Sequence, residues 1–266
     1  MPHASAKQFA VVTGASSGIG YELANQFAQN GFDVLIVAED AGIADAARRL
    51  ATDGSEIQSL QVDLATYEGV EELYNRILST GRHLDAIAIN AGVGVAGPFV
   101  NSDLRAQLNL INLNITGAVH LTHRILKDMV TTGQGRILIT SSIAATMPGS
   151  FNATYNASKS FLKSFSEAIR NELKDTGVTV TALMPGATDT NFFHRAGADD
   201  TKVGSGKKDS AAEVAREGFE ALMEGKDHVV AGSFLNKVQA TIAHVLPDTV
   251  NAELHRKQAE PGSGNK

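Results

Sequence analysis

The sequence predicts a three-layer α/β fold, in which a doubly wound parallel β-sheet is covered by helices on both faces. Short runs of β-branched and aliphatic residues alternate along the chain with longer stretches of helical period, as expected of such a sheet. The chain has 266 residues, of which 43% are hydrophobic, so it can bury one large core. We therefore expect a single domain over residues 1–266, with its core at about 8–235.

The apolar runs place seven strands, and the periodic stretches between them place six helices. The expected strands are Phe9–Thr13, Asp33–Ala38, Ile57–Val62, Leu84–Asn90, Arg136–Ser141, Val178–Met184 and His228–Ala231. Helices are expected to begin near Ile19, Ala41, Tyr67, Asp103, Tyr155 and Ala211. The fifth helix carries an apolar stripe at steps of four residues, which predicts packing against the core or a partner helix.

Two late regions break this alternation. Residues 186–210 are long for a structureless connection and rich in Gly, Lys, Asp and Ser, so we interpret them as a loop that covers a substrate. Residues 259–266 are small and polar, and we expect this tail to be disordered.

Composition excludes several classes of function. The formal net charge of -6 gives no attraction to nucleic acid or to an anionic membrane surface. The absence of cysteine excludes disulfides, thiolate catalysis and sulfur-ligated metals. His120 and His123 lack the acidic or cysteine partners of a metal site, so no metal is expected. Since Met1 to Gln8 lacks the pattern of a secretory signal and no long apolar segment follows, we expect a cytoplasmic location.

A glycine-rich turn follows the first strand. Its sequence is Thr-Gly-Ala-Ser-Ser-Gly-Ile-Gly, and the residues expected to approach a ligand are Gly14, Ser16, Ser17, Gly18, Ile19 and Gly20. Glycines at these positions allow a tight strand-to-helix turn and close approach of the backbone to a pyrophosphate. The free N–H groups at the helix start would then face the phosphates. The turn thus predicts dinucleotide binding by a Rossmann-like fold.

The same residues also satisfy the G-x-S-x-G pattern of a hydrolase nucleophile elbow. That elbow follows several strands, because an earlier strand and loop must supply the oxyanion hole. Here the motif follows the first strand, and Gly20 has no use in a hydrolase. The dinucleotide interpretation is therefore preferred, and the hydrolase remains an alternative.

The ends of the second and third strands carry acidic residues where an adenosine would lie. Glu39 follows the second strand; its carboxylate can accept a hydrogen bond from a ribose 2′-hydroxyl but would repel a 2′-phosphate. This favours NAD(H), with NADP(H) as the alternative. Asp63, followed by Leu64, lies at the end of the third strand, where it can meet the adenine amino group or cap a helix.

Tyr155 and Lys159 are spaced i and i+4 at the start of a helix, which places an ammonium beside a phenol. A free phenol has a pKa near 10, so its deprotonation at pH 7 costs roughly 4 kcal/mol, and an adjacent lysine lowers that cost. Ser142 follows a buried strand at the sheet edge where ligands of this architecture bind. Asn114 lies within the preceding long helix, where its amide has either a structural role or a role with backbone or water.

Taken together, these motifs resemble the short-chain dehydrogenase/reductase family, in its single-domain Tyr-x-x-x-Lys form, over about residues 8–235. The resemblance rests on the glycine turn, Asp63, Asn114, Ser142, Tyr155, Lys159 and the segments Asn90-Ala91-Gly92 and Pro185-Gly186 with Thr188 and Thr190. The chain departs from the family at Ile89, where a second asparagine is usual, and at Ala38, the usual position of an NAD-selecting aspartate.

The resemblance implies an NAD(P)-dependent oxidoreductase that interconverts an alcohol and a ketone or aldehyde. It makes Tyr155 the acid/base, while Ser142 holds the substrate oxygen and Lys159 contacts the nicotinamide ribose and depresses the pKa of Tyr155. Asn114 would hold a water that links Lys159 to solvent. The segment from Asn90 through Ala91 to Gly92 would line the adenosine-ribose side. The nicotinamide end would be gripped by Pro185, Gly186, Thr188 and Thr190.

Three further expectations concern partners. An apolar pocket suggests a small carbonyl or alcohol substrate with hydrophobic bulk; its candidate residues are Ala144, Met147, Phe151, Phe192 and Phe193. By resemblance, the long helices from Asp103 and Tyr155 would form the interface of a homodimer or homotetramer. A cofactor-binding sensor or scaffold without catalysis is the alternative function, disfavoured because the phenol–ammonium pair is intact.

Overall fold

The computed structural model describes residues 7–51, 54–243 and 246–265, and its strands form one parallel sheet of seven. The strands are β1 (Phe9–Thr13), β2 (Asp33–Ala38), β3 (Ile57–Gln61), β4 (Ala86–Ile89), β5 (Gly135–Thr140), β6 (Val178–Pro185) and β7 (His228–Ala231). Their spatial order is β3-β2-β1-β4-β5-β6-β7. The order reverses between β1 and β4, and in such sheets ligands bind at the carboxyl ends of the strands beside this reversal. Register in the centre pairs Ala10 with both Val34 and Ala86.

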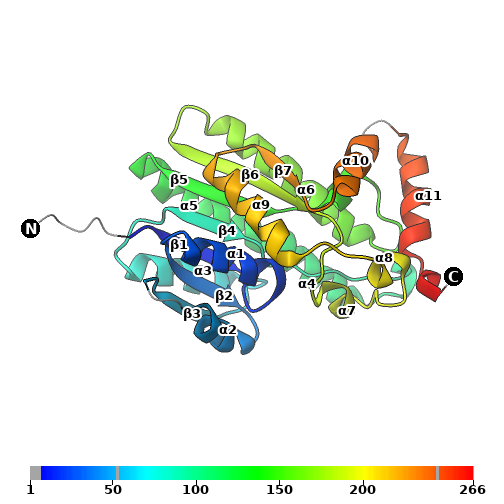
Figure 1. Cartoon of the computed structure of the whole chain (residues 1–266), viewed down its shortest axis with the longest axis horizontal. Helices are drawn as coiled ribbons and strands as arrows, with labels where there is room; N and C mark the ends of the chain where they lie inside the picture. Colours follow the sequence, from blue (N-terminus) through cyan, green and yellow to red (C-terminus); the bar gives the residue numbers. More distant parts are fainter. Residues whose placement is uncertain (1–6, 52–53, 244–245, 266) are drawn as a thin grey trace, which may run out of the picture.

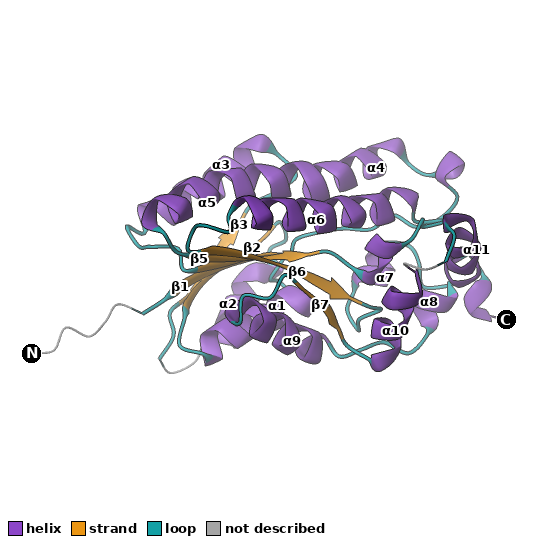
Figure 2. Cartoon of the chain, turned by 90° about the horizontal axis from the view of Figure 1, so that it is seen from above, coloured by secondary structure: helices purple, strands orange, loops and turns teal. Residues whose placement is uncertain are grey.

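Helices cover both faces of the sheet, as the sequence predicts (Figure 2). One layer contains α1 (Gly18–Gln29), α2 (Gly42–Leu50) and α9 (Ala211–Met223); the other contains α3 (Tyr67–Ser79), α4 (Leu104–Ile111), α5 (Ala118–Thr132) and α6 (Ala153–Glu172). Two buried apolar clusters hold the layers to the sheet. In the first, the rings of Phe27, Phe32 and Phe219 meet edge to face.

The helix expected to run on from Asp103 is interrupted. Between α4 and α5 the chain forms a π-helical segment, η2 (Asn112–Gly117). Each bond of such a segment spans one more residue than an α-helical bond does, and π-helical turns are frequent at functional sites. This segment contains Asn114.

The C-terminal part differs most from the sequence expectation. The region 186–210 contains two short helices, α7 (Phe192–Arg195) and α8 (Lys202–Ser205), and two unpredicted helices follow β7, namely α10 (Phe234–Ala243) and α11 (Asp248–Ala259). The tail, expected to be disordered, forms a 3-10 turn, η4 (Ser263–Asn265), because hydrogen bonds join it to Asp200 and Lys202. Lys266 and Met1–Ala6 lie outside the described residues.

Figure 1 shows α7, α8, α10 and α11 together at one end of the molecule, beyond the carboxyl ends of the strands. This is the end at which the sheet architecture places a ligand. Within the described ranges, no helix has both the length and the apolar character needed to cross a bilayer.

Candidate functional site

The glycine turn between β1 and α1 has the tight geometry that the sequence predicts. Gly14 and Gly18 adopt φ values of +66° and +61°, which favour glycine. A Cβ on Gly14 would lie 2.8 Å from the Cα of Ala91, and one on Gly20 would lie 2.1 Å from the carbonyl oxygen of Gly14. Gly14 and Gly20 therefore let the turn pack against the segment after β4 and against itself.

The start of α1 suits a phosphate group. Its N-cap, Ser17, makes no side-chain capping hydrogen bond, and the first turn carries no acidic residue. The first N–H groups of a helix need acceptors, and the positive end of the helix dipole favours an anion. Ile19 is partly buried and packs against the core, which fixes the helix start. These features fit the pyrophosphate of a dinucleotide.

Acidic side chains surround the expected ribose position. Glu39 is exposed at the end of β2, and Asp40 beside it accepts a hydrogen bond of 2.7 Å from the Ser16 hydroxyl. A second oxygen of Asp40 accepts from the backbone N–H of Gly42 at 3.0 Å. Sequence reasoning missed Asp40, although its position next to Glu39 could have suggested it.

Asp63 and Leu64 lie beside the end of β3. Asp63 is exposed and accepts a hydrogen bond from the backbone N–H of Ala65, whereas the N-cap of α3 is Thr66. Asp63 therefore does not cap this helix, and its exposed carboxylate stays compatible with contact to an adenine. Leu64 is buried, and its carbonyl oxygen packs against Gly117 of the π-helical segment.

Asn90 lies just after β4 and bonds to the ends of the two strands on either side of it, β1 and β5. Its amide nitrogen donates to the carbonyl of Thr13 at 3.1 Å, and its amide oxygen accepts from the Thr140 hydroxyl at 3.1 Å. The Thr13 hydroxyl in turn accepts from the backbone N–H groups of Asn90 and Ala91. Thr13 opens the glycine motif, whereas Thr140 was missed because threonines are common in strands. This network holds together the three strand ends beneath the position expected for the cofactor.

Ser142 and Tyr155 meet at the carboxyl edge of β5. Ser142 accepts from the backbone N–H of Ala144 at 3.1 Å and donates to the carbonyl of Pro185 at 3.3 Å. Burial raises the pKa of Tyr155 to about 12, while a hydrogen bond with Ser142 acts to lower it. The phenol is therefore protonated at neutral pH.

Lys159 is buried one turn after Tyr155, with its Nζ 5.7 Å from the centre of the Tyr155 ring. The ammonium donates to the carbonyl of Thr140 at 2.8 Å. Burial lowers the pKa of Lys159 to about 8. Burial is the largest influence on both groups, since it disfavours their charged forms: it raises the pKa of Tyr155 and lowers that of Lys159. The expected lowering of the Tyr155 pKa by Lys159 stays a prediction.

Asn114 lies beside Lys159, and both hydrogens of its side-chain amide are bonded to the protein. Its amide oxygen accepts from the backbone N–H of Val93, and its amide nitrogen donates to the Val93 carbonyl and to the Ser158 hydroxyl. A Cβ on Gly92 would lie 3.2 Å from this amide oxygen and 3.4 Å from Lys159 Nζ. A water bound at Asn114 would therefore donate to an oxygen of this residue, because both amide hydrogens are already used.

The segment after β6 closes over the glycine turn. A Cβ on Gly18 would lie 2.9 Å from the Thr190 side chain, so this residue touches the turn. Thr190 also accepts from the backbone N–H of Phe192, and Thr188 donates to the carbonyl of Gly186. Thr188 pairs with Asp209 in an isolated parallel bridge, which closes the base of the loop.

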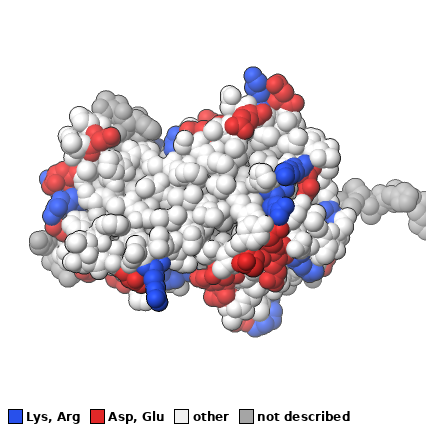
Figure 3. All heavy atoms as spheres, turned by 180° about the vertical axis from the view of Figure 1, so that it is seen from behind, with Lys and Arg blue, Asp and Glu red and all other residues white. Residues whose placement is uncertain are grey.

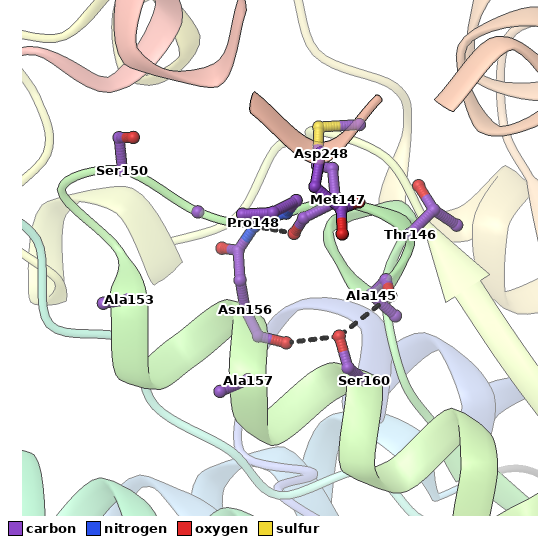
Figure 4. A pocket seen from close by; sticks show the side chains of 11 residues that line it. Ala145, Thr146, Met147, Pro148, Ser150, Ala153, Asn156, Ala157, Ser160 and Asp248 are labelled. Atoms are coloured by element: carbon purple, nitrogen blue, oxygen red, sulfur yellow. Dashed lines mark hydrogen bonds between the residues drawn. The ribbon is translucent and has the colours of Figure 1, made fainter. Parts of the chain in front are cut away.

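The predicted apolar residues separate into different places. The ring of Phe192 lies 5.1 Å from that of Tyr155, centre to centre, whereas Phe193 lies under the ammonium of Lys208 at 5.4 Å. Met147 lines a separate groove of about 610 Å³, together with neighbouring residues between β5 and α6 and with Asn156 of α6 (Figure 4). Phe192 is thus the apolar side chain placed beside the phenol.

A dinucleotide-type glycine turn and a Ser, Tyr and Lys cluster meet at one edge of a doubly wound sheet, and together they define the class of nucleotide-dependent oxidoreductases. Comparison with known proteins narrows this class. Residues 8–201 match the family model described as short chain dehydrogenase. The chain belongs to this family.

Individual relatives agree with the assignment. An uncharacterized oxidoreductase from Staphylococcus saprophyticus is 30% identical over 217 residues, which covers 81% of this chain and 91% of that protein. A short-chain dehydrogenase from Sphingobium yanoikuyae in complex with NADPH has 28% identity and a TM-score of 0.78, covering 84% of this chain and 87% of the other. A 3-ketoacyl-(acyl-carrier-protein) reductase from Brucella melitensis complexed with NADH has 26% identity and a TM-score of 0.71, covering 81% and 90%.

The protein is therefore an oxidoreductase that acts on a CH–OH group or the corresponding carbonyl with a nicotinamide cofactor. The hydrolase alternative is ruled out by this assignment.

Proposed function

We propose that the protein is an NAD(H)-preferring dehydrogenase that interconverts a ketone or aldehyde and its alcohol, on a substrate with apolar bulk. The observation that carries this proposal is the meeting of Ser142, Tyr155 and Lys159 beside the glycine turn. Their roles are those expected from the family, and each is testable.

The protein's contribution to reduction is proton delivery and positioning. When bound, the nicotinamide supplies the hydride to the carbonyl carbon. Tyr155 gives its proton to the carbonyl oxygen, and Ser142 donates a hydrogen bond to the same oxygen. Lys159 holds the ribose. Because burial raises the pKa of Tyr155 to about 12, the phenol keeps its proton at neutral pH and enters the reduction in its protonated form.

The acidic end of β2 supports NAD(H) over NADP(H). Glu39 is exposed there, and Asp40 is fixed beside it by Ser16. A 2′-hydroxyl can donate a hydrogen bond to either carboxylate, whereas a 2′-phosphate would meet like charge. We expect NADH to bind at least about tenfold more tightly than NADPH, the equivalent of roughly 1.4 kcal/mol.

The position of Phe192 supports a substrate with an apolar group next to its carbonyl. Its ring lies against Tyr155 and above Gly94, where a Cβ would come within 2.7 Å of the ring. An apolar substituent can replace these contacts when the substrate enters, whereas a charged substituent would lose its hydration there.

The test is the Tyr155→Phe variant, which removes only the hydroxyl that carries the proton. We expect NADH titration, followed by nicotinamide fluorescence, to be unchanged within about twofold, while kcat for an aryl ketone falls by about 10²–10⁴-fold. The control is Tyr74→Phe, which removes a hydroxyl bonded to Asp128 on the α3 face and should leave kcat unchanged. Full turnover by Tyr155→Phe would contradict the mechanism. A wild-type protein that binds NADH but reduces no carbonyl compound would favour a sensor.

A further inference from the structure

Three segments border the site, and hydrogen bonds tie them to one another. Residues 92–97, after β4, approach Lys159 and Phe192. Residues 142–152, between β5 and α6, and residues 186–206, after β6, contact Tyr155 through Ser142 and Phe192. The backbone N–H of Gly97 donates to the carbonyl of Phe151 at 2.8 Å, and that of Ala96 donates to the carbonyl of Ala196 at 2.9 Å. The segment 92–97 thus connects the segments 142–152 and 186–206.

Helix α11 contacts the second of these segments. The Ser150 hydroxyl donates to the carbonyl of Ala252 at 3.0 Å, and His255 Nδ1 lies 3.0 Å from the Ser150 carbonyl. Since a carbonyl only accepts, Nδ1 carries the hydrogen in this contact. The guanidinium of Arg256 lies 5.2 Å from the centre of the Phe151 ring. Two adjacent residues of α11 therefore hold two adjacent residues of the segment.

The same C-terminal stretch contacts the third segment beyond the end of α11. The backbone N–H of Gly262 donates to the carboxylate of Asp200, and that of Gly264 donates to the Asp200 carbonyl at 2.8 Å. The Ser263 hydroxyl accepts from the backbone N–H of Lys202 at 2.9 Å. Figures 1 and 2 show α11 beside α8 at this end of the molecule. Residues 248–265 thus connect two segments that border the site.

Phe151 has a backbone conformation that its own sequence does not favour. Its φ is +65°, and among the described residues it is the one non-glycine residue with positive φ. Bulky side chains rarely adopt this region, and such strain persists only where the surroundings hold it. The surroundings here are Gly97 on one side and Arg256 on the other.

The groove shown in Figure 4 lies between α6 and the start of α11, and the segment 142–152 passes between these helices. On the α6 side, Asn156 donates to the carbonyls of Ala144 and Met147, and Ser160 donates to that of Ala145. Asp248, the first residue of α11, lines the opposite side. The α6 contacts fix the first half of the segment, and those from α11 fix residues 150 and 151.

We propose that residues 248–265 form a positioning element of the substrate site, in which His255 and Arg256 set the position of Ser150 and Phe151 relative to Tyr155. This element lies beyond residue 201, where the match to the family model ends. The contacts leave the glycine turn and the ends of β2 and β3 untouched. His255 and Arg256 reach the segment at Ser150 and Phe151, away from the residues expected to hold the cofactor, so we expect these two residues to affect substrate binding and not cofactor binding. The inference rests on the proposed function of Tyr155.

The kinetic test uses His255→Ala and Arg256→Ala. For each we expect KM for an aryl ketone to rise up to about tenfold, because the contact that holds Ser150 or Phe151 in place, worth about 1 kcal/mol, is lost. We expect kcat to stay within about threefold and the NADH dissociation constant within about twofold. His255→Asn, whose amide can donate near the position of Nδ1, should restore most of the lost affinity. Lys257→Ala is the matched control, because this neighbouring side chain is exposed, and it should leave KM unchanged.

A second measurement needs no turnover. Hydrogen exchange at the backbone N–H of Asn152, which donates to the carbonyl of Gly149, should be faster in His255→Ala and Arg256→Ala than in wild type or Lys257→Ala. If no carbonyl compound is reduced by wild type, the proposed function fails, while faster exchange still supports the positioning element. Unchanged KM and exchange in both variants, or a dissociation constant for NADH that rises in step with KM, would overturn it.

Discussion

At the scale of single residues, burial disfavours the charged forms of the two titratable groups of the site, Tyr155 and Lys159. Lys159 is buried, and its ammonium has the Thr140 carbonyl as its hydrogen-bond acceptor. Burial lowers the pKa of Lys159 to about 8 from an ordinary value of 10.5. Below pH 8 the folded protein therefore carries a buried ammonium at Lys159. This charge lowers the free energy of unfolding, and the protein keeps it for function.

This cost predicts that Lys159→Met is more stable than wild type at pH 7. The folded pKa lies about 2.5 units below the unfolded one, so the penalty is about 3 kcal/mol below pH 8. It fades as pH rises from 8 to 10.5, where the unfolded chain binds the proton and the folded one does not. Subtracting about 1 kcal/mol for the Thr140 carbonyl that loses its donor leaves a gain of about 2 kcal/mol.

Urea unfolding at pH 7 and at pH 10 measures this difference. The advantage of Lys159→Met should shrink toward zero at pH 10, while its turnover is lost at both pH values. A variant that is less stable than wild type at pH 7 would show that the buried ammonium is stabilising.

At the scale of elements, the π-helical segment η2 positions Asn114 against the segment after β4 and against α6. Its last residue, Gly117, packs against a loop: a Cβ there would lie 2.2 Å from the carbonyl oxygen of Leu64. Because this neighbour is backbone, it cannot move aside as a side chain can. The close approach of the segment to the end of β3 therefore depends on a glycine.

Gly117→Ala should destabilise the protein by about 2–3 kcal/mol, the usual cost of overpacking, although alanine favours helices. The matched control is Gly218→Ala in α9, where a Cβ would meet only the flexible Leu183 side chain at 3.0 Å. We expect the control to change the free energy of unfolding by less than about 1 kcal/mol. Equal losses in the two variants, measured by urea unfolding, would contradict the role given to the Leu64 contact.

The elements also show what the sequence could and could not predict. Ser142, Tyr155 and Lys159 were found because their spacing and strand context carry a signal. Thr140 and Ser158 were missed because single hydroxyl residues at ordinary positions carry none. The same limit applies to elements: apolar periodicity does not reveal the extra residue of a π-helical turn, and the order of the tail depends on hydrogen bonds to Asp200, far away in sequence.

At the scale of the whole molecule, one side of the surface is unusually apolar. Five exposed apolar side chains lie on the layer of α4 and α6 or just before it, and they are Phe99, Val100, Leu104, Leu108 and Phe161. The exposed fraction is 87% for Val100 and 64% for Leu104. The face of the molecule seen in Figure 3 has few charged side chains across its middle. Exposed apolar groups gathered in this way mark an interaction surface.

We propose that this surface joins two copies of the chain, the interface expected from the helices that begin near Asp103 and Tyr155. In a two-fold arrangement each apolar side chain is used twice, so one charge introduced there enters the interface twice. Leu108→Glu, at a position half exposed in the single chain, should therefore convert the oligomer to monomers while circular dichroism stays unchanged.

Light scattering after size-exclusion chromatography measures this change against the mass of one chain, 28.0 kDa. Leu254→Glu is the control, since this side chain on α11 is 47% exposed and lies outside the proposed surface. The control should keep the mass of the wild type. If wild type itself is monomeric, or if Leu108→Glu keeps the wild-type mass, the α4 and α6 face is not the interface. A loss of mass with Leu254→Glu alone would place the interface at the C-terminal end, where it would meet the positioning element.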